Sequence, residues 1–314
     1  MALITRANTA GLIPVEYSNE LLKTVPEGSW AMKLGRRLRD MSRYQTLLQV
    51  SSALSTAYFV SGDTGAKQTT NLEWSDVTLQ AEELAVIVPI PENVLDDAEV
   101  PIWDEALPDI KNAIGKAVDQ AVFGGTNIPA SWNTAIGGAG IVAVATAKSN
   151  SVALGAGADL YDDLLGDGGV FSLVEADGFA VSGSVAHLGM KGKLRGVRGS
   201  DGQPIFMTDP AIAGGYMLAG APTYFPTNGA MVTTAPLIAG DFSQLVYSIR
   251  KDVTWKVLTE AVIQDGAGNI LYNLAQQDMV ALRVVVRLGF ALPNPVNRVN
   301  TGASRYPFAI LTSA

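Results

Sequence analysis

The chain contains no cysteine and only one histidine, His187. The lack of cysteine excludes disulfide bonds, thiol nucleophiles and thiolate zinc sites, and it is typical of a reducing compartment. With one histidine, a single subunit cannot build a site that needs two imidazoles. A Ser-His-Asp triad would also lack its usual G-x-S-x-G turn, so we interpret His187 as an ordinary surface or core side chain.

Long apolar runs are also missing. The longest one extends from Leu84 to Ile90 and is interrupted by Pro89, so no segment is long enough to span a bilayer. The N-terminal segment lacks the continuous apolar core of a secretory signal. These features predict a soluble protein that is made in a cytoplasm and has no membrane partner.

Positive charge is scarce, because 22 Lys and Arg residues stand against 30 Asp and Glu, a net charge of −8. A domain that grips nucleic acid by its phosphates is usually basic, so dedicated DNA binding is disfavoured. The chain has 314 residues, of which 48% are hydrophobic and 17% charged, which indicates a globular protein of about two domains. Its 32 glycines follow no collagen-like period and favour turns and β-structure.

The glycine clusters do not form a nucleotide site. Residues 138–143 match G-x-G-x-x-A, and Asp159 lies near the spacing of a ribose-binding acid, but this fingerprint must follow a strand and open a helix. Here a polar segment comes first, and residues 141–147 read as a strand. The Gly-Lys pairs at Gly115 and Gly192 lack the Ser or Thr of a P-loop. EF-hand and H-E-x-x-H patterns are absent as well, so we expect no cofactor and no metal.

Carboxylate pairs occur at Asp96-Asp97 and at Asp162-Asp163. Neighbouring residues on a helix do not face each other, so neither pair is a ready acid–base dyad. The first pair places negative charge before a long helix, where it suits the positive end of the helix dipole. A chain with so few catalytic patterns is expected to be structural and not an enzyme. A β-rich hydrolase that uses Asp162 or Asp163 remains as an alternative.

Two helices and a basic run are expected near the start of the chain. Residues 16–22 predict two helical turns, and residues 30–41 have apolar side chains at helical spacing. Between Lys33 and Arg43, five positive side chains stand against one acid, a local balance of +4. This run is interpreted as a solvated helix face, and the alternative is a contact with an acidic neighbour or a basic patch facing an interior. Its charged members are Lys33, Arg36, Arg37, Arg39, Asp40 and Arg43.

A long polar stretch separates two segments that read as strands, residues 57–60 and residues 74–81. Between them, residues 61–71 contain no large apolar side chain. A hairpin needs only about two to five connecting residues, so this span is far longer than a turn requires. It has nothing apolar of its own to bury. We therefore expect this arm to complete itself on another molecule.

The strongest helix signal covers residues 101–123, with apolar residues at helical spacing. Pro101 suits the first helical position, and Gly124-Gly125 is a natural stop. At about 1.5 Å per residue the helix is about 35 Å long. This is long for a globular domain, in which the mean helix has about 11–12 residues.

Further strands surround this helix in the sequence. Residues 84–88 form a continuous apolar run, which predicts a strand buried on both faces. Asp159 is a plausible cap for a short helix that ends near Leu165. Residues 253–263 and 270–274 predict two strands joined by a glycine-rich turn. Residues 282–288 alternate apolar side chains with arginines, which indicates a strand with one wet face.

In this order the features resemble the major capsid proteins of tailed bacteriophages, which have the Hong Kong 97 type of fold. Three parts of the chain carry the resemblance, and they cover roughly residues 12–292. They are LEWSDVTLQAEELAVIVPIPENVLDDAEV with the long helix and FGGTNIPASW; DLYDDLLG with VSGSVAHLGMKGKLRGVRGSDGQPIF and LAGAPTYF; and IAGDFSQLVYSIRKDVTWKV with LYNLAQQDMVALRVVVRLGFAL.

The resemblance implies an α+β fold with an N-terminal arm, an extended β-hairpin loop, a long spine helix, a peripheral-domain β-sheet and a mixed α/β axial domain. The expected division is 1–50 for the N-terminal arm and helix, 51–90 for the extended loop, 91–148 and 236–288 for the peripheral domain with spine helix 101–123, and 149–235 with 289–314 for the axial domain.

The resemblance also implies the function. The chain is expected to self-assemble as hexamers and pentamers into the icosahedral shell of a virion that encloses double-stranded DNA without reading its sequence. Assembly is expected in the bacterial host cytoplasm, with portal and decoration proteins as further partners. Because Met1 lies close to the arm, we expect a separate scaffolding protein or none. An encapsulin-type nanocompartment shell shares this fold and remains as an alternative.

In the family, the extended loop lies across a neighbouring subunit, which implies contact residues in this chain. Some relatives link this loop covalently to the neighbour through a lysine and an asparagine. Here a single lysine lies near the tip, and we expect a non-covalent contact instead. The expected subunit-contact residues are Lys67, Glu73 and Trp74 on the loop, and Arg36, Arg37 and Arg39 in the basic run.

Overall fold

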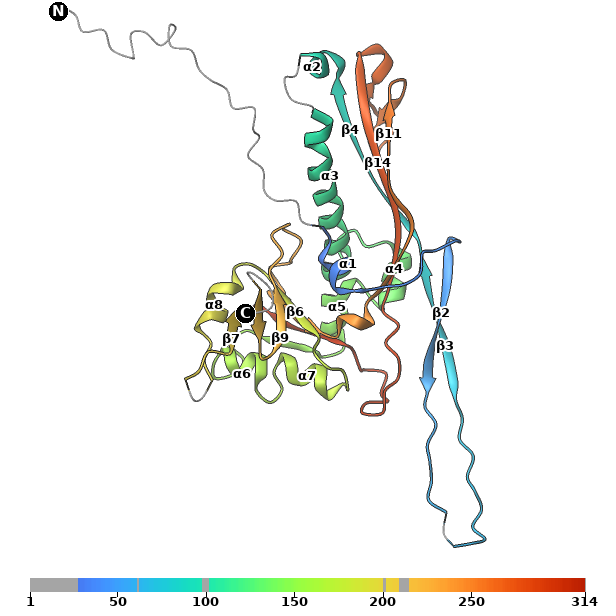
Figure 1. Ribbon diagram of the computed structural model, residues 1–314, viewed down its shortest axis with the longest axis vertical. Coiled ribbons are helices and arrows are strands. Elements are labelled where there is room, and N and C mark those ends of the chain that lie inside the picture. Colours follow the sequence, from blue (N-terminus) through green and yellow to red (C-terminus); the bar gives the residue numbers. More distant parts are fainter. Residues whose placement is uncertain (1–27, 61, 98–101, 200–201, 209–214, 314) are drawn as a thin grey trace, which may run out of the picture.

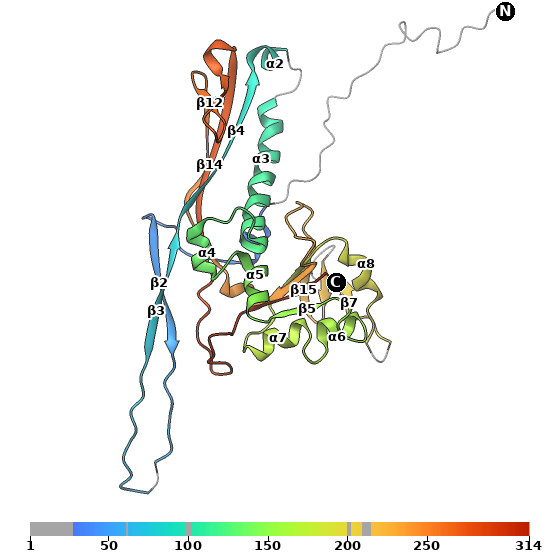
Figure 2. The same ribbon diagram turned by 180° about the vertical axis from the view of Figure 1, so that it is seen from behind.

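The computed structural model describes residues 28–60, 62–97, 102–199, 202–208 and 215–313. The expected N-terminal helix over residues 16–22 and the first residue of the spine helix, Pro101, lie outside the described residues. Two sheet-containing bodies lie side by side, and a two-stranded ribbon projects from their junction (Figures 1 and 2).

The first body is built on a four-stranded sheet with the order β1-β11-β14-β4. Its strands are β1 (Arg36–Arg37), β4 (Glu82–Pro91), β11 (Val246–Leu258) and β14 (Met279–Ala291). The central strand β14 is antiparallel to both of its neighbours, whereas β1 runs parallel to β11. Because strand side chains alternate between faces, Leu282, Val284 and Val286 all point to one face, where they are buried.

The long helix α3 (Ile102–Asp119) lies along that face of the sheet (Figure 1). Its buried residues Ile110, Ile114 and Val118 share one core with those of β14. The helix continues as a π-helical turn, Gln120–Gly124, and stops at Gly125. Gly125 has a φ of 72°, and a Cβ there would collide with the Ala139 carbonyl. The predicted spine helix and its glycine stop are confirmed.

The second body is built on a seven-stranded sheet with the order β5-β15-β10-β6-β9-β8-β7. Its strands are β5 (Ser151–Ala153), β6 (Gly183–Ala186), β7 (Phe206–Thr208), β8 (Tyr216–Leu218), β9 (Ala221–Tyr224), β10 (Leu237–Gly240) and β15 (Phe308–Thr312). The accompanying helices are α6 (Leu160–Leu165), α7 (Val170–Ala176), α8 (Met190–Gly196) and the 3-10 turn Phe242–Gln244. Strands β6 and β10 are buried along their whole length, so the centre of this sheet belongs to the hydrophobic core of the second body.

Two short helices, α4 (Ala130–Ile136) and α5 (Gly140–Ala147), connect the bodies, and the predicted strand over residues 141–147 is wrong. Ile141, Val144 and Ala145 are buried in the core shared with α3, and this packing overrides the strand preference of β-branched residues. The G-x-G-x-x-A match therefore does open a helix. A helix rather than a strand precedes it, so the nucleotide fingerprint remains absent.

The predicted single helix over residues 30–41 is also wrong. Helix α1 (Trp30–Leu34) stops at Gly35, where a Cβ would lie only 2.6 Å from the Ala31 carbonyl oxygen. The chain then runs extended beside β11, since the Arg36 and Leu38 N–H groups donate to carbonyls of that segment at 2.8 Å. Pairing with a strand that lies distant in the sequence therefore replaces the expected helical turns.

The projecting ribbon consists of β2 (Gln45–Ala53) and β3 (Glu73–Gln80), which pair antiparallel. The predicted strand over residues 74–81 is confirmed. The predicted strand over residues 57–60 is wrong, because none of the described residues between Ala53 and Glu73 belongs to a strand. Among the described residues, no second layer covers this ribbon and loop, and an isolated two-stranded pair is marginal in water.

The strand predicted over residues 84–88 exists as part of β4, but its two faces differ. Leu84, Val86 and Val88 pack against the core beside α3, whereas Ile87 faces the other way and is 43% exposed. In the described part of the chain, only one layer, that of α3, covers this sheet. The expectation that both faces are buried is therefore wrong for the single chain.

Asp159 caps α6 as predicted, since its carboxylate accepts the N–H groups of Tyr161 and Asp162. The predicted strand over residues 253–263 is divided, because β11 ends at Leu258 and a separate strand, β12 (Val262–Gln264), follows. At the far end of the four-stranded sheet, β12 and β13 (Ile270–Asn273) pair across the predicted turn, followed by the 3-10 turn Leu274–Gln276. A short helix, α2 (Glu92–Asp96), lies at the same end (Figure 1).

Candidate functional site

The ribbon has one face turned to its own body and one face turned to solvent. On the inner face, Val50 and Leu79 are buried. They follow the alternation of the strands, so their neighbours Leu47 and Trp74 point outward and are 63% and 66% exposed. The structure thus places Trp74, one of the expected contact residues, on an open apolar surface.

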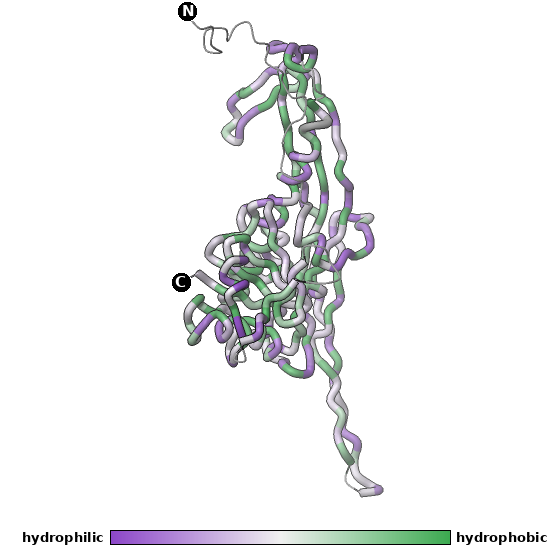
Figure 3. Tube along the Cα trace, turned by 60° about the vertical axis from the view of Figure 1, so that its left-hand side comes forward, coloured by the Kyte–Doolittle hydropathy of each residue, from purple (hydrophilic) through white to green (hydrophobic). Residues whose placement is uncertain are grey.

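The loop beyond the ribbon adds further exposed apolar side chains. Tyr58, Val60 and Leu72 are exposed, and Phe59 is fully so. Figure 3 shows short hydrophobic stretches in this loop, distant from the two bodies. Burial of apolar surface contributes about 25 cal/mol per Å², so these exposed side chains would gain free energy if a partner covered them.

Among the described residues, the charged side chains of the arm form no ion pairs. Lys67 lies near the tip and Glu73 at the start of β3, and both are exposed. In the described part of the chain, Asp63, Glu73 and Asp76 form no ion pair. The arm therefore brings Lys67, Glu73 and Trp74 together on one projecting element, as the sequence suggested.

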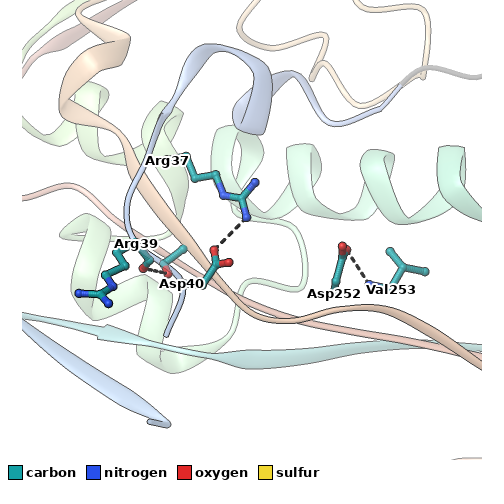
Figure 4. A network of polar contacts seen from close by, with 6 residues as sticks. Arg37, Arg39, Asp40, Asp252 and Val253 are labelled. Carbon is teal, nitrogen blue, oxygen red and sulfur yellow. Dashed lines mark hydrogen bonds and ion pairs between the residues drawn. The ribbon is translucent and has the colours of Figure 1, made fainter. Parts of the chain in front are cut away.

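The basic run lies elsewhere, at the edge of the four-stranded sheet. Arg36, Arg37 and Arg39 are all exposed. The Arg37 guanidinium donates to the Asp40 carboxylate at 2.9 Å, and this hydrogen bond and charge raise the pKa of Arg37. Figure 4 shows that the Arg39 side chain points away from this pair. Arg36 and Arg37 therefore form β1 and Arg39 follows it, so the three arginines do not form one helix face.

A buried carboxylate, Asp119, fixes the segment that leads into the basic run. It accepts hydrogen bonds from the Ser29 hydroxyl at 2.6 Å, the backbone N–H groups of Trp30 and Ala31, and the Asn228 amide. Burial raises the pKa of Asp119, and these hydrogen bonds oppose the rise. The sequence analysis missed this residue. Its signal is a carboxylate inside the apolar stripe of a helix.

A second charged surface, which we call the outer sheet face, lies on the side of the four-stranded sheet opposite α3. Its members on β11 and β14 are Lys251, Lys256, Arg283 and Arg287, with Glu83 on β4. Lys256 lies directly opposite Arg283 in the register, and Lys251 directly opposite Arg287. The sequence predicted a wet face on β14, but it did not reveal that lysines of β11 lie beside these arginines.

The expected alternative centred on two aspartates has no catalytic geometry. Asp163 is buried and accepts the backbone N–H groups of Gly155 at 2.6 Å and Gly157 at 2.7 Å, so it holds the loop before α6. His187 accepts the Gly189 N–H through Nδ1 and lies within a local turn. Among the described residues, acids and histidine gather at no place that could hold a metal ion. None of their helices could cross a membrane.

Comparisons with known proteins cover nearly the whole chain. Residues 9–297 match the phage capsid family. The major capsid protein of Staphylococcus phage 80alpha is 25% identical over 283 residues, which cover 88% of this chain and 81% of that protein. A solved chain from Microbacterium phage Oxtober96 is 34% identical with a TM-score of 0.82 over 100% of both chains. One from Mycobacterium phage Adephagia is 32% identical with a TM-score of 0.80, over 100% of this chain and 99% of that one.

Proposed function

Because this chain belongs to the phage capsid family and is a major capsid protein of a tailed phage, we propose that its copies assemble as hexamers and pentamers into an icosahedral shell around double-stranded DNA. Its α+β, Hong Kong 97-type fold agrees with the expectation from the sequence. As a capsid protein, the chain is a component of the virion.

The projecting ribbon is the observation that carries this proposal. Its outward face and its loop expose Leu47, Phe59 and Trp74 in a single chain, although each is apolar. The described residues provide no second layer on which the loop could fold (Figure 1). We infer that a neighbouring copy covers this arm, with Lys67, Glu73 and Trp74 among the contact residues.

The chain's charge suits a container for DNA. A net charge of −8 keeps the shell from binding its cargo tightly, so packaged DNA is enclosed without sequence-specific contacts. The exposed residues Arg36 and Arg39 are proposed to face the interior or an acidic neighbour. Assembly in the host cytoplasm, and a separate scaffolding protein, a portal and decoration proteins as partners, belong to the same proposal.

The domain division follows the two sheets. We propose that the four-stranded body is the peripheral domain and the seven-stranded body the axial domain. Strand β10 pairs within the seven-stranded sheet, so the boundary expected at residue 236 is placed after Gly240. β4 pairs within the four-stranded sheet, which assigns residues 82–90 to the peripheral domain rather than to the extended loop.

The phage capsid family is one of structural proteins and not of enzymes. We propose that this chain likewise has no catalytic activity. The hydrolase alternative requires a reactive Asp162 or Asp163, and the buried Asp163 carboxylate is held by backbone N–H groups of the loop before α6. No observation favours an encapsulin-type shell that encloses enzymes.

Electron microscopy and sedimentation of the full chain test the proposal. Phe59→Ser changes the fully exposed side chain of the loop, and we expect it to lower the yield of closed particles about tenfold or more while the subunit stays folded. Val299→Ser is the matched control, because Val299 is also exposed but lies outside the ribbon. Wild-type protein that forms no particles with phage scaffolding proteins present would contradict the proposal.

A further inference from the structure

A long connection joins the two bodies beside the base of the ribbon. Residues 292–307, which we call the bracing loop, are all described by the structure, and they run from β14 of the first body to β15 of the second without forming a helix or strand. Loops longer than about 12–15 residues that lack such elements are uncommon and are usually functional. Figure 1 shows this loop in dark red, between the second body and β2.

A buried arginine gives the bracing loop its shape. Only 9% of Arg305 is exposed, and its guanidinium donates to three backbone carbonyls of the same loop. The acceptors are Pro295 at 3.1 Å, Gly302 at 2.8 Å and Asn294 at 2.9 Å. A guanidinium is costly to bury unless its donors are paired, so these bonds hold the loop in one conformation.

The second body holds the far side of the bracing loop. The buried Asp177 carboxylate, which follows α7, accepts the Asn300 amide and the Tyr306 N–H, each at 2.8 Å. The Asp177 backbone carbonyl accepts the Asn297 amide at 2.7 Å. At Gly178 a Cβ would lie 2.6 Å from the Asn297 Oδ1, so this close approach requires glycine. The loop is therefore anchored on the second body.

The near side of the bracing loop holds the first strand of the ribbon. The Val296 N–H donates to the Ser51 carbonyl of β2 at 3.1 Å. The Arg298 guanidinium donates to the Ser55 carbonyl, beyond the end of β2, at 3.0 Å. The two acceptors are four residues apart, roughly 13 Å in an extended chain. Two separated contacts fix a direction, whereas one contact alone would leave the ribbon free to pivot.

The direction of the ribbon matters because the ribbon is long. From Ser51 to Gly62 the chain can extend by at most about 40 Å. A rotation of about 10° at the base would therefore move the tip by up to about 7 Å. Because one residue of a strand rises about 3.3 Å, such a rotation would shift any contact of the tip by about two residues.

We propose that the bracing loop sets the direction of the ribbon relative to the second body, with Arg298 as the residue that positions the ribbon and Arg305 as the residue that shapes the loop. Through Ala81, β3 leads directly into β4, so the first body holds one strand of the ribbon and the loop holds the other. The inference rests on the proposed function, because the direction is important only where the ribbon reaches another copy.

Electron paramagnetic resonance of spin-labelled, unassembled subunits tests this direction. Because the chain has no cysteine, Ser75→Cys on β3 and Glu175→Cys on α7 give two defined label positions, both exposed. We expect a narrow distribution of distances between the labels when no other residue is changed. With Arg298→Ala the distribution should become about twofold wider or more, and Arg305→Ala should have the same effect.

The matched control removes another exposed arginine of the second body. Arg198→Ala lies outside the bracing loop and should leave the distribution of distances unchanged. The urea midpoint of unfolding of Arg298→Ala should equal that of wild type, since most surface substitutions change stability little. A wider distribution at unchanged stability is the readout that a merely structural role would not produce. If circular dichroism shows that Arg305→Ala does not fold, the result for Arg298→Ala decides.

Electron microscopy of assembled particles is the second readout. With Arg298→Ala we expect the fraction of closed particles of wild-type diameter to fall about threefold or more, because ribbons that point in different directions join copies at different rotations. Distances as narrowly distributed as in wild type overturn the inference, and a loss of particles at such a narrow distribution shows that Arg298 contacts another molecule instead. Normal particles despite a wider distribution overturn the role in assembly.

The two proposals fail in different ways. The label experiment needs no particles, so it can reject the bracing loop while the capsid function stays intact. A wild-type chain that never forms particles with phage scaffolding proteins present rejects the capsid function, whatever distances the labels give.

Discussion

The seven-stranded body and the ribbon differ in whether their apolar side chains are buried. In the former, the strands β6 and β10 are buried along their whole length within the single chain. In the ribbon, Leu47 and Trp74 lie in solvent on the outward face. One region buries its apolar residues within the subunit, whereas we propose that the other buries them only in the assembly. The four-stranded sheet lies between these extremes, with one face under α3 and the other open.

The sharpest test of this comparison removes one aromatic ring from each region. Phe308→Ala deletes a fully buried side chain that packs edge-on against Phe242 at 5.1 Å between ring centroids. We expect the free energy of unfolding of the isolated subunit to fall by about 3–5 kcal/mol. Denaturant unfolding followed by circular dichroism measures it.

Phe59→Ala is the paired variant, because Phe59 is fully exposed. We expect the free energy of unfolding of the isolated subunit to change by less than about 0.5 kcal/mol. Equal losses in the two variants would show that the loop packs on its own chain, and the comparison would break.

A second prediction concerns the buried carboxylate that joins α1 to α3. Asp119→Ala leaves the Ser29 hydroxyl, two backbone N–H groups and the Asn228 amide without this acceptor. We expect a loss of about 2–4 kcal/mol, with faster amide hydrogen exchange at Trp30 and Ala31. Exchange that stays as slow as in wild type would show that α1 is held by its other contacts.

The titration of Asp119 gives a smaller, pH-dependent effect. Burial raises its pKa in the folded state, so the folded chain binds this proton at a higher pH than the unfolded chain. The stability that protonation of Asp119 contributes is therefore fully present below the pKa of this residue in the unfolded chain, near 3.9. It is lost as the pH rises through the pKa of Asp119 in the folded chain. Asp119→Asn should remove this component from the pH profile measured by urea unfolding above pH 4.

The smallest effect is expected at the exposed pair of Arg37 and Asp40. Surface ion pairs contribute little because water and salt screen them. We expect Arg37→Ala to leave the melting temperature of the subunit unchanged by differential scanning calorimetry. A clear drop in melting temperature would show that β1 depends on this contact more than on its backbone pairing with β11.

Local signals predicted several elements correctly. The spine helix follows from its apolar spacing and glycine stop, and the α6 cap from Asp159. These features depend on neighbours within a few residues, which the sequence displays. The failures have long-range causes: α1 ends because Arg36 pairs beside β11, and α5 is helical because Ile141 is needed in the core.

The contact surfaces show the same division. The exposure of Lys67, Glu73 and Trp74 could be predicted, because they lie in or beside a polar stretch that has no large apolar side chain to bury. The outer sheet face could not be predicted, because it exists only once Lys256 and Arg283 are brought together by strand pairing. Likewise, the role of Asp119 depends on Ser29 and Asn228, which are distant in the sequence.

The opposite directions of the ribbon and the sheet have a geometric consequence. In the proposed shell, a subunit that reaches its neighbour with the ribbon joins its copies head to tail, and such a series either closes into a ring or continues as a filament. The rotation between successive copies differs by only about 12° between rings of five and of six. We therefore expect a small change in the direction of the ribbon at the base of β2 and β3 to distinguish the two kinds of ring.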